Sequence, residues 1–118
     1  MRYRVYGISS CDTVRKACKW LDAQGIAYER VDLRATPPTS EQISDWIQSL
    51  GSRAMRNTSG GSYRALPDEK KTWSDEAWLD AFVSDPMLLK RPIIVRDGKA
   101  LGVGFRGSEE ELVARFLD

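Results

Sequence analysis

The sequence predicts an α/β fold with a mixed four-stranded sheet and the element order β-α-β, helices, β-β-α. Three observations predict it. Near the amino terminus, an apolar stretch is followed by an amphipathic helix and a second strand. From about residue 39 to residue 90, the chain carries mainly helical patterns and turn formers. Beyond that, the turn dipeptide Asp97-Gly98 joins two apolar runs ahead of a last amphipathic helix.

The first two strands and the helix between them are predicted from apolar spacing. Residues 2–8 have the pattern of a strand, and residues 26–33 have that of a second one. Between them, four residues recur at helical spacing ahead of a glycine that can end the helix: Val14, Ala17, Cys18 and Leu21. A strand–helix–strand unit of this length normally pairs its strands in parallel through a right-handed crossover. Cys11 is therefore expected at the start of the helix, next to the end of the first strand.

The middle of the chain is predicted to contain two main helices. Thr39 and Gln42 match a capping box ahead of apolar residues at helical spacing. Ser74 can cap a further helix, which should end near Asp85-Pro86 because a proline disfavours helix in the residue before it. Residues 53–63 show no period and are rich in turn formers, so a loop is expected there.

The carboxyl-terminal part is predicted to be a hairpin and a helix. Residues 93–95 and 100–103 are joined by a dipeptide suited to a two-residue turn. Ser108 and Glu111 form a second capping box before the last amphipathic helix. The whole order corresponds to a thioredoxin-like fold with a helical insertion over about residues 39–90.

Length and composition indicate one domain over residues 1–118. A chain of 118 residues with 42% apolar and 30% charged residues can bury one core. The net charge of +1 is spread nearly evenly, which argues against a nucleic-acid partner. Apolar runs are too short to cross a bilayer, and no secretory signal pattern is seen. We therefore expect a cytoplasmic monomer that contacts no membrane.

The residue inventory also restricts the chemistry. The chain has no histidine, which excludes a Cys-His dyad and nearly all zinc-hydrolase designs. With two cysteines, it cannot assemble a four-ligand Cys/His zinc site or a four-Cys iron–sulfur site by itself. We expect no metal and no bound cofactor.

Cys11 is the candidate nucleophile. The unpaired N–H groups and the dipole at the start of a helix favour an anionic thiolate, the reactive form of cysteine. The alternative is that Cys11 packs as a small apolar residue. Cys18 lies on the apolar stripe of the helix and is expected in the core. Seven helical residues separate the two Cα atoms by about 10 Å, too far for a disulfide, so an external thiol must reduce any Cys11 adduct.

Two arginines are candidates for binding an anion at Cys11. Arg91 and Pro92 open the hairpin, and Arg106 follows it. The fold should bring both arginines toward the edge of the sheet near Cys11, where two guanidinium groups would stabilise a thiolate and bind an oxyanion or carboxylate in bidentate fashion. The alternative is that both are ordinary solvated or salt-bridged arginines.

Three segments together resemble the arsenate reductase (ArsC/Spx) family of thioredoxin-like proteins, and the resemblance covers essentially the whole chain. They are Cys11-Asp12-Thr13-Val14, Lys90-Arg91-Pro92-Ile93-Ile94-Val95 and Gly104-Phe105-Arg106. The resemblance implies that Cys11 is the nucleophile and that Arg91 and Arg106 bind an oxyanion and favour the thiolate. It also implies that Pro92 is the cis-proline of the fold.

The resemblance does not decide which residue is the third arginine of the site. Glutathione-dependent arsenate reductases carry one in the loop after the second helix, where Arg56 is the nearest candidate. The segment from Asn57 to Arg64 is more similar to a sister branch associated with glutathione-dependent thiol reduction, in which Arg64 is the comparable position. Arg56, Asn57 and Arg64 are therefore further candidates for substrate binding.

Two functions follow from the resemblance. The first is a glutathione-dependent thiol reductase, in which Cys11 attacks an oxyanion such as arsenate or a disulfide, and glutathione as co-substrate, or glutaredoxin, resolves the adduct. The second is an Spx-like regulatory module that contacts a protein partner such as RNA polymerase, with Trp73 and Trp78 as candidate contact residues. Spx proteins often have a Cys-x-x-Cys switch, and Val14 stands where its second cysteine would be.

Overall fold

A computed structural model describes residues 2–118 and contains the predicted mixed four-stranded sheet. In sheet order, the strands are β2 (Tyr28–Asp32), β1 (Tyr3–Gly7), β3 (Ile93–Arg96) and β4 (Lys99–Val103). β1 and β2 are parallel and are joined through α1 (Asp12–Ala23). β3 runs antiparallel to both β1 and β4. The thioredoxin-like element order is confirmed.

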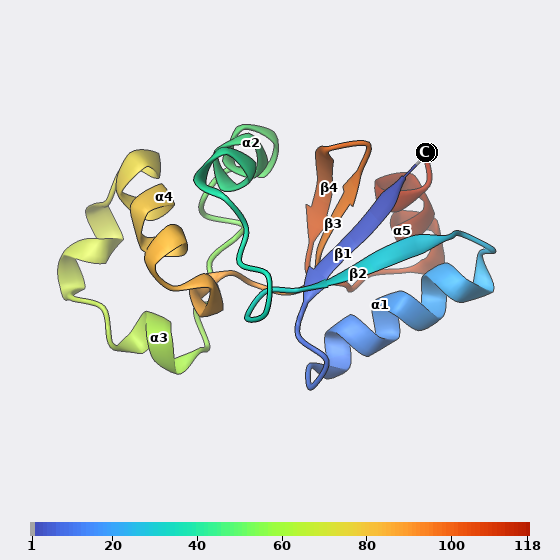
Figure 1. The fold of residues 1–118 in the computed structure, drawn as a ribbon, viewed down its shortest axis with the longest axis horizontal. Helices are drawn as coiled ribbons and strands as arrows, with labels where there is room; N and C mark the ends of the chain where they lie inside the picture. Colours follow the sequence, from blue (N-terminus) through green and yellow to red (C-terminus); the bar gives the residue numbers. More distant parts are fainter. Residues whose placement is uncertain (1) are drawn as a thin grey trace.

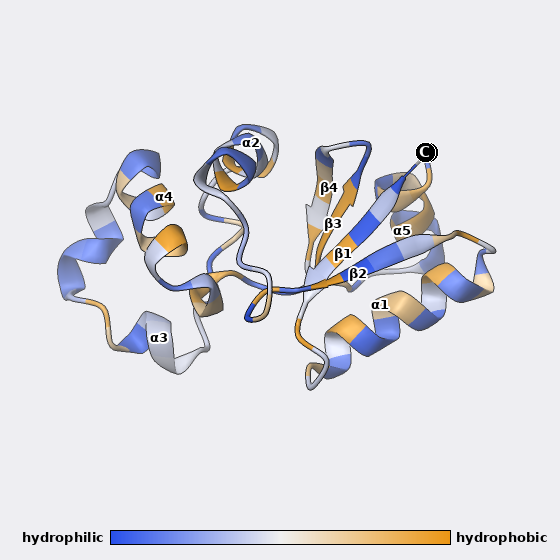
Figure 2. Ribbon diagram, viewed as in Figure 1, coloured by the Kyte–Doolittle hydropathy of each residue, from blue (hydrophilic) through white to orange (hydrophobic). Residues whose placement is uncertain are grey.

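The sheet has a helical layer on each face (Figure 1). Alternate residues of a strand point to opposite faces. Tyr3 and Val5 of β1 pack with α1 and α5 (Glu109–Phe116), whereas Tyr6 packs with Trp46 of α2 (Ser40–Leu50). Hydrophobic and hydrophilic residues alternate along α1, as an amphipathic helix requires (Figure 2).

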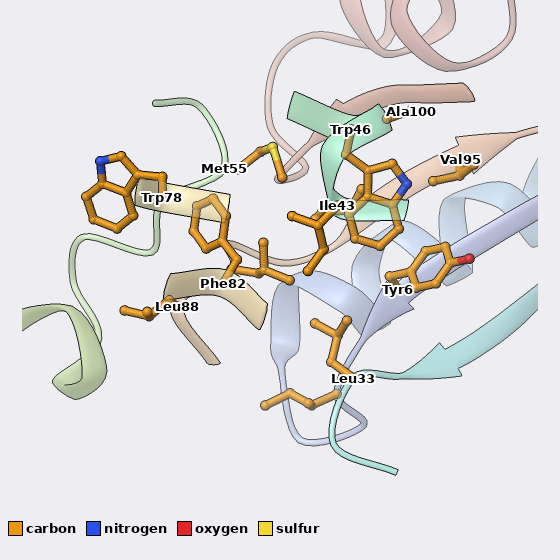
Figure 3. Packing of buried hydrophobic residues seen from close by; sticks show 13 residues of the cluster. Tyr6, Leu33, Ile43, Trp46, Met55, Trp78, Phe82, Leu88, Val95 and Ala100 are labelled. Carbon is orange, nitrogen blue, oxygen red and sulfur yellow. The ribbon is translucent and has the colours of Figure 1, made fainter. Parts of the chain in front are cut away.

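The segment between β2 and β3 is helical, as predicted. In addition to α2, it contains α3 (Gly61–Arg64), η1 (Asp68–Thr72), α4 (Asp75–Ser84) and η2 (Pro86–Leu88). Its core is continuous with that under the sheet, because Ile43 lies between Trp46 and Phe82 (Figure 3). Among residues 2–118, no helix has both the length and the apolar character needed to cross a membrane.

One element within this segment differs from the prediction. The expected loop over residues 53–63 includes the start of α3, a single helical turn. So short a helix has no apolar repeat, and its N-cap residue Gly60 makes no side-chain hydrogen bond. Neither of the usual sequence signals of a helix is therefore present.

The hairpin turn and the helix starts form as predicted. Asp97 and Gly98 both have positive φ, 52° and 85°, as a type I′ turn requires. Thr39 and Gln42 form the first capping box, and Ser108 and Glu111 form the second. These local signals fix where β3, β4, α2 and α5 begin or end.

The second capping box is expected to make stability depend on pH. Backbone and side-chain hydrogen bonds from Ser108 lower the pKa of the Glu111 carboxyl. A group whose pKa is lowered by folding stabilises the protein above its unfolded value of about 4.3, and this contribution is lost as the pH falls through the folded value. Glu111→Gln keeps an acceptor but removes the charge. Chemical denaturation should therefore show this variant less stable than wild type at pH 7, with the difference shrinking toward pH 3. A difference independent of pH would contradict this.

Candidate active site

Cys11 lies at the N-cap of α1, as predicted. Its backbone is extended, with φ −87° and ψ 120°, and no side chain caps the helix. Its carbonyl oxygen accepts a hydrogen bond from the N–H of Arg15 at 3.2 Å. The residue is half-buried and packs against both hydrophobic clusters, whereas Cys18 is only 6% exposed. Because no side chain occupies the N–H groups of the first turn, they are available to an anion at Cys11.

Arg15 is a cationic neighbour of Cys11 that the sequence reasoning missed. It lies one helical turn after Cys11, and its guanidinium is hydrogen-bonded to the carboxylate of Asp12. A second nitrogen donates to the carbonyl oxygen of Ser9 at 3.4 Å. The guanidinium is thus held over the start of α1. The i, i+4 spacing from Cys11 to Arg15 was the available signal.

The sheet register brings the predicted segments to one end of the sheet, where β1 and β4 finish and β3 begins. Tyr6 pairs with Ile93, and Ile93 pairs with Val103. The chain therefore leaves β1 toward Cys11, enters β3 from Pro92 and leaves β4 toward Arg106 at the same end of the sheet. The N–H of Gly104 also donates to the carbonyl oxygen of Pro92 at 2.8 Å. The Arg91–Pro92 peptide bond is cis, as the resemblance implied.

The two predicted arginines differ in what they contact. Arg91 is half-buried, and its Nη1 donates to the carbonyl oxygens of Leu89 at 3.0 Å and Met87 at 3.2 Å. Arg106 is exposed and makes no hydrogen bond or ion pair with any residue in the described range 2–118. Arg106 is therefore free to bind an anion, whereas Arg91 is partly held by its own backbone.

Arg56 lies within the helical segment. Its guanidinium carbon is 4.4 Å from the centre of the Trp78 ring, and its Nη2 donates to the hydroxyl of Ser52 at 2.8 Å. Burial lowers the pKa of the Arg56 guanidinium. The backbone of Arg56 forms a bridge with Leu89, two residues before Arg91. The main chain thus runs beside the site, while the side chain packs on an aromatic ring.

Asn57 and Arg64 are engaged within their own loop. The N–H of Asn57 donates to the carbonyl oxygen of Leu88 at 2.8 Å, and its amide oxygen accepts from the hydroxyl of Ser59 at 3.4 Å. Arg64 is exposed, and its Nη1 donates to the carbonyl oxygen of Ser59 at 2.6 Å. The backbone hydrogen bond of Asn57 fixes this loop beside the segment that leads to Pro92.

A cavity of about 770 Å³ lies away from Cys11, between the sheet and α2. It is lined by Arg2, Arg4, Tyr6, Gln42, Asp45, Trp46, Val95, Asp97 and Gly98. We place the candidate site at Cys11 and not in this cavity, because no cysteine lines the cavity. Within residues 2–118, no three His, Cys, Asp or Glu side chains lie close enough together to hold a metal ion.

Known proteins resemble this chain along nearly its whole length. Residues 6–113 match the model of the ArsC family. An uncharacterized protein of Haemophilus influenzae is 36% identical over 113 residues, which cover 95% of this chain and 96% of that protein. The arsenate reductase of Neisseria meningitidis is 31% identical over 100 residues, covering 82% of this chain and 86% of the reductase. The crystal structure of a possible arsenate reductase from Streptococcus mutans has a TM-score of 0.82 at 34% identity, covering 93% of this chain and 96% of that one. The chain therefore belongs to the ArsC family.

Proposed function

We propose that this protein is a cytoplasmic glutathione-dependent thiol reductase whose nucleophile is Cys11. One observation carries the proposal: a half-buried thiol stands at the uncapped start of α1, on the sheet edge that also presents Arg91 and Arg106. A helix start and guanidinium groups favour an anionic thiol and an anionic substrate. The similarity to the arsenate reductase of Neisseria meningitidis also supports it.

With a mixed disulfide of glutathione, the Cys11 thiolate attacks the glutathione sulfur. The disulfide bond breaks, and the substrate leaves as a thiolate that takes a proton from solvent. The thiolate of a second glutathione then attacks the glutathione sulfur of the Cys11 adduct. This step releases glutathione disulfide and restores the Cys11 thiolate. The substrate is reduced by two electrons, and two glutathione units end as one disulfide.

With arsenate, the Cys11 thiolate attacks arsenic and an oxygen leaves as water. A glutathione thiolate then attacks the Cys11 sulfur, the sulfur–arsenic bond breaks, and its electron pair stays on arsenic, which leaves as arsenite. A second glutathione, or glutaredoxin, attacks the resulting Cys11–glutathione disulfide and frees the Cys11 thiolate. Two electrons from two thiols thus reduce one arsenate.

The surrounding groups stabilise negative charge in both routes. The first N–H groups of α1 are not capped by a side chain and stabilise a thiolate at the same helix start, and Arg106, which has no partner among the described residues, binds the anionic substrate. Arg91 contributes from the start of β3, and Arg15 adds positive charge one turn away. Arg56 and Asn57 contribute through their backbones, which join the helical insertion to Leu88 and Leu89 ahead of Arg91, and Arg64 is held within the same loop.

The proposal is tested by turnover with glutathione as the sole reductant. The purified protein is incubated with arsenate, or with a mixed disulfide of glutathione and a small thiol, and glutathione disulfide is followed by NADPH and glutathione reductase. We expect glutathione disulfide to form above the uncatalysed rate with at least one of the two substrates. The assay is run both with and without added glutaredoxin. Absence of turnover with both would overturn the proposal. Absence of turnover together with stable binding of RNA polymerase would favour the regulatory alternative instead.

A further inference from the structure

We propose that Phe105 is a positioning residue that fixes Arg106 at the site by joining its loop to α1 and α5. This inference rests on the proposed function, in which Arg106 binds an anion beside Cys11. It concerns how one exposed arginine is held in place, and it is testable without a known substrate.

The loop that carries Arg106 is fixed by backbone contacts at both ends. At one end, the N–H of Gly104 donates to the carbonyl oxygen of Pro92 at 2.8 Å. At the other end, Ser108 caps α5. Gly104 and Gly107 both have positive φ, 75° and 124°, a region that glycine adopts more readily than other residues. Glycine restricts the backbone less than other residues do, so a side-chain anchor between the two glycines adds to the order of the loop.

The Phe105 ring provides that anchor. Its centre is 5.7 Å from the ring centre of Trp20 in α1 and 6.1 Å from that of Phe116 in α5, where the two planes meet at 23°. Trp20 and Phe116 are themselves 6.3 Å apart. The three rings form a cluster to which α1, the loop and α5 each contribute one member. Aromatic pairs at these separations are stabilising and prefer particular orientations.

A polar contact fixes the Trp20 ring in turn. Its Nε1 donates to the two carboxylate oxygens of Glu109 at 2.9 and 3.2 Å, and Gln24 donates to the same carboxylate at 3.2 Å. These bonds tie α1 to the first turn of α5. Phe105 and Cys11 also pack against the same buried cluster. The aromatic contact therefore connects the helix that begins at Cys11 with the loop that carries Arg106.

Arg106 depends on this connection because nothing else holds it. It is exposed and has no hydrogen bond or ion pair with the residues that the structure describes. Its direction is set by the backbone of its own loop. If the Phe105 ring is removed, the hydrogen bond from Gly104 to Pro92 still joins the loop to the start of β3, but the loop loses its aromatic contacts with α1 and α5.

Alkylation of Cys11 measures the effect of Arg106 directly. Iodoacetate and iodoacetamide react with a thiolate in the same way: a carbon–sulfur bond forms and iodide leaves. They differ in charge, so the ratio of their rates reports the positive potential at the thiol. Both rates scale equally with the fraction of thiolate, which cancels in the ratio. All variants carry Cys18→Ala, so that Cys11 is the only thiol.

We expect Arg106→Gln to lower the iodoacetate/iodoacetamide ratio by about 3- to 10-fold at low salt, where charge effects are least screened. Phe105→Ala should lower it nearly as much, while the iodoacetamide rate stays within about twofold of wild type. Because the two residues act as one unit, the double variant should lose little more than either single variant. Leu79→Ala is the matched control. Leu79 is a half-buried apolar residue of α4 that packs against the other hydrophobic cluster, so its loss should leave the ratio unchanged.

Phe105→Leu keeps the apolar volume and folds even if the alanine variant does not. It should lower the ratio about twofold, because the aromatic contacts are lost. An unchanged ratio in both Phe105 variants, with a lowered one in Arg106→Gln, would overturn the inference and leave the proposed function intact. At a pH where Cys11 is fully ionised, a fall in the rates of both reagents alike would show a merely structural role and would also overturn it. An unchanged ratio in Arg106→Gln would remove the role of Arg106 itself, and the turnover assay would then decide the function separately.

Discussion

Replacement of Cys11 with serine is expected to lower turnover by about 10³-fold or more, because a reductase of this kind forms its covalent bond through the thiolate. A serine hydroxyl ionises far less readily than a thiol and cannot exchange with a disulfide. Cys11 is the N-cap residue of α1, but its side chain makes no hydrogen bond there. A serine hydroxyl at this position can accept one from the first turn, so the fold should persist. The measurement is the rate of glutathione disulfide formation with saturating substrate.

Cys18→Ala is the matched control for this experiment. Cys18 is 6% exposed and packs in the core between α1 and the sheet, where a cysteine behaves as a small apolar residue. Alanine there should keep most of the activity. Equal activity of Cys11→Ser and wild type would exclude Cys11 as the nucleophile. Loss of activity in Cys18→Ala, with stability retained, would assign Cys18 a role in the reaction.

Replacement of Trp78 with alanine is expected to destabilise the protein by about 3–5 kcal/mol, the usual cost of removing a large buried aromatic side chain. Trp78 is fully buried, and its ring lies 5.1 Å from Trp73, 5.5 Å from Phe82 and 6.1 Å from Tyr63. It also lies under the guanidinium of Arg56. Its removal therefore opens a cavity and leaves a partly buried cation without its aromatic contact. Chemical denaturation measures the loss.

Such a loss is a large share of the stability of a domain, which is typically about 5–15 kcal/mol. Trp78→Phe should cost much less, because phenylalanine refills most of the volume and removes an indole N–H that has no hydrogen-bond partner within residues 2–118. Val83→Ala, at a site 43% exposed on the same helix, should be nearly neutral. A free energy of unfolding for Trp78→Ala within about 1 kcal/mol of the wild-type value, obtained from the denaturation midpoint, would contradict this account.

Much of the fold could be predicted because its signals are local. Asp97-Gly98 favours positive φ at two successive residues, and that alone determines the turn between β3 and β4. Ser108 and Glu111 mark the start of α5 by satisfying its first N–H groups. The position of Cys11 followed from the boundary between an apolar strand and an amphipathic helix. These features depend on residues within a few positions of one another.

Features that depend on distant contacts could not be predicted in this way. Trp78 was a candidate surface residue for a protein partner, and this was wrong, because it lies at the centre of an aromatic cluster and is fully buried. Arg56 was a candidate for substrate binding on the basis of its place in the loop, but the sequence gives no sign that its guanidinium packs on Trp78. The hydrogen bonds from Arg91 to the carbonyl oxygens before it were likewise not visible in the sequence.

The junction between the helical insertion and the reactive edge is made by main-chain atoms. Asn57 donates to Leu88, and Lys90 donates to Met55, each at 2.8 Å. Bonds of this kind persist through most amino-acid replacements, because every residue except proline offers the same donor and acceptor. Side-chain replacements within the insertion should therefore leave this junction, and the position of the segment that leads to Pro92, in place.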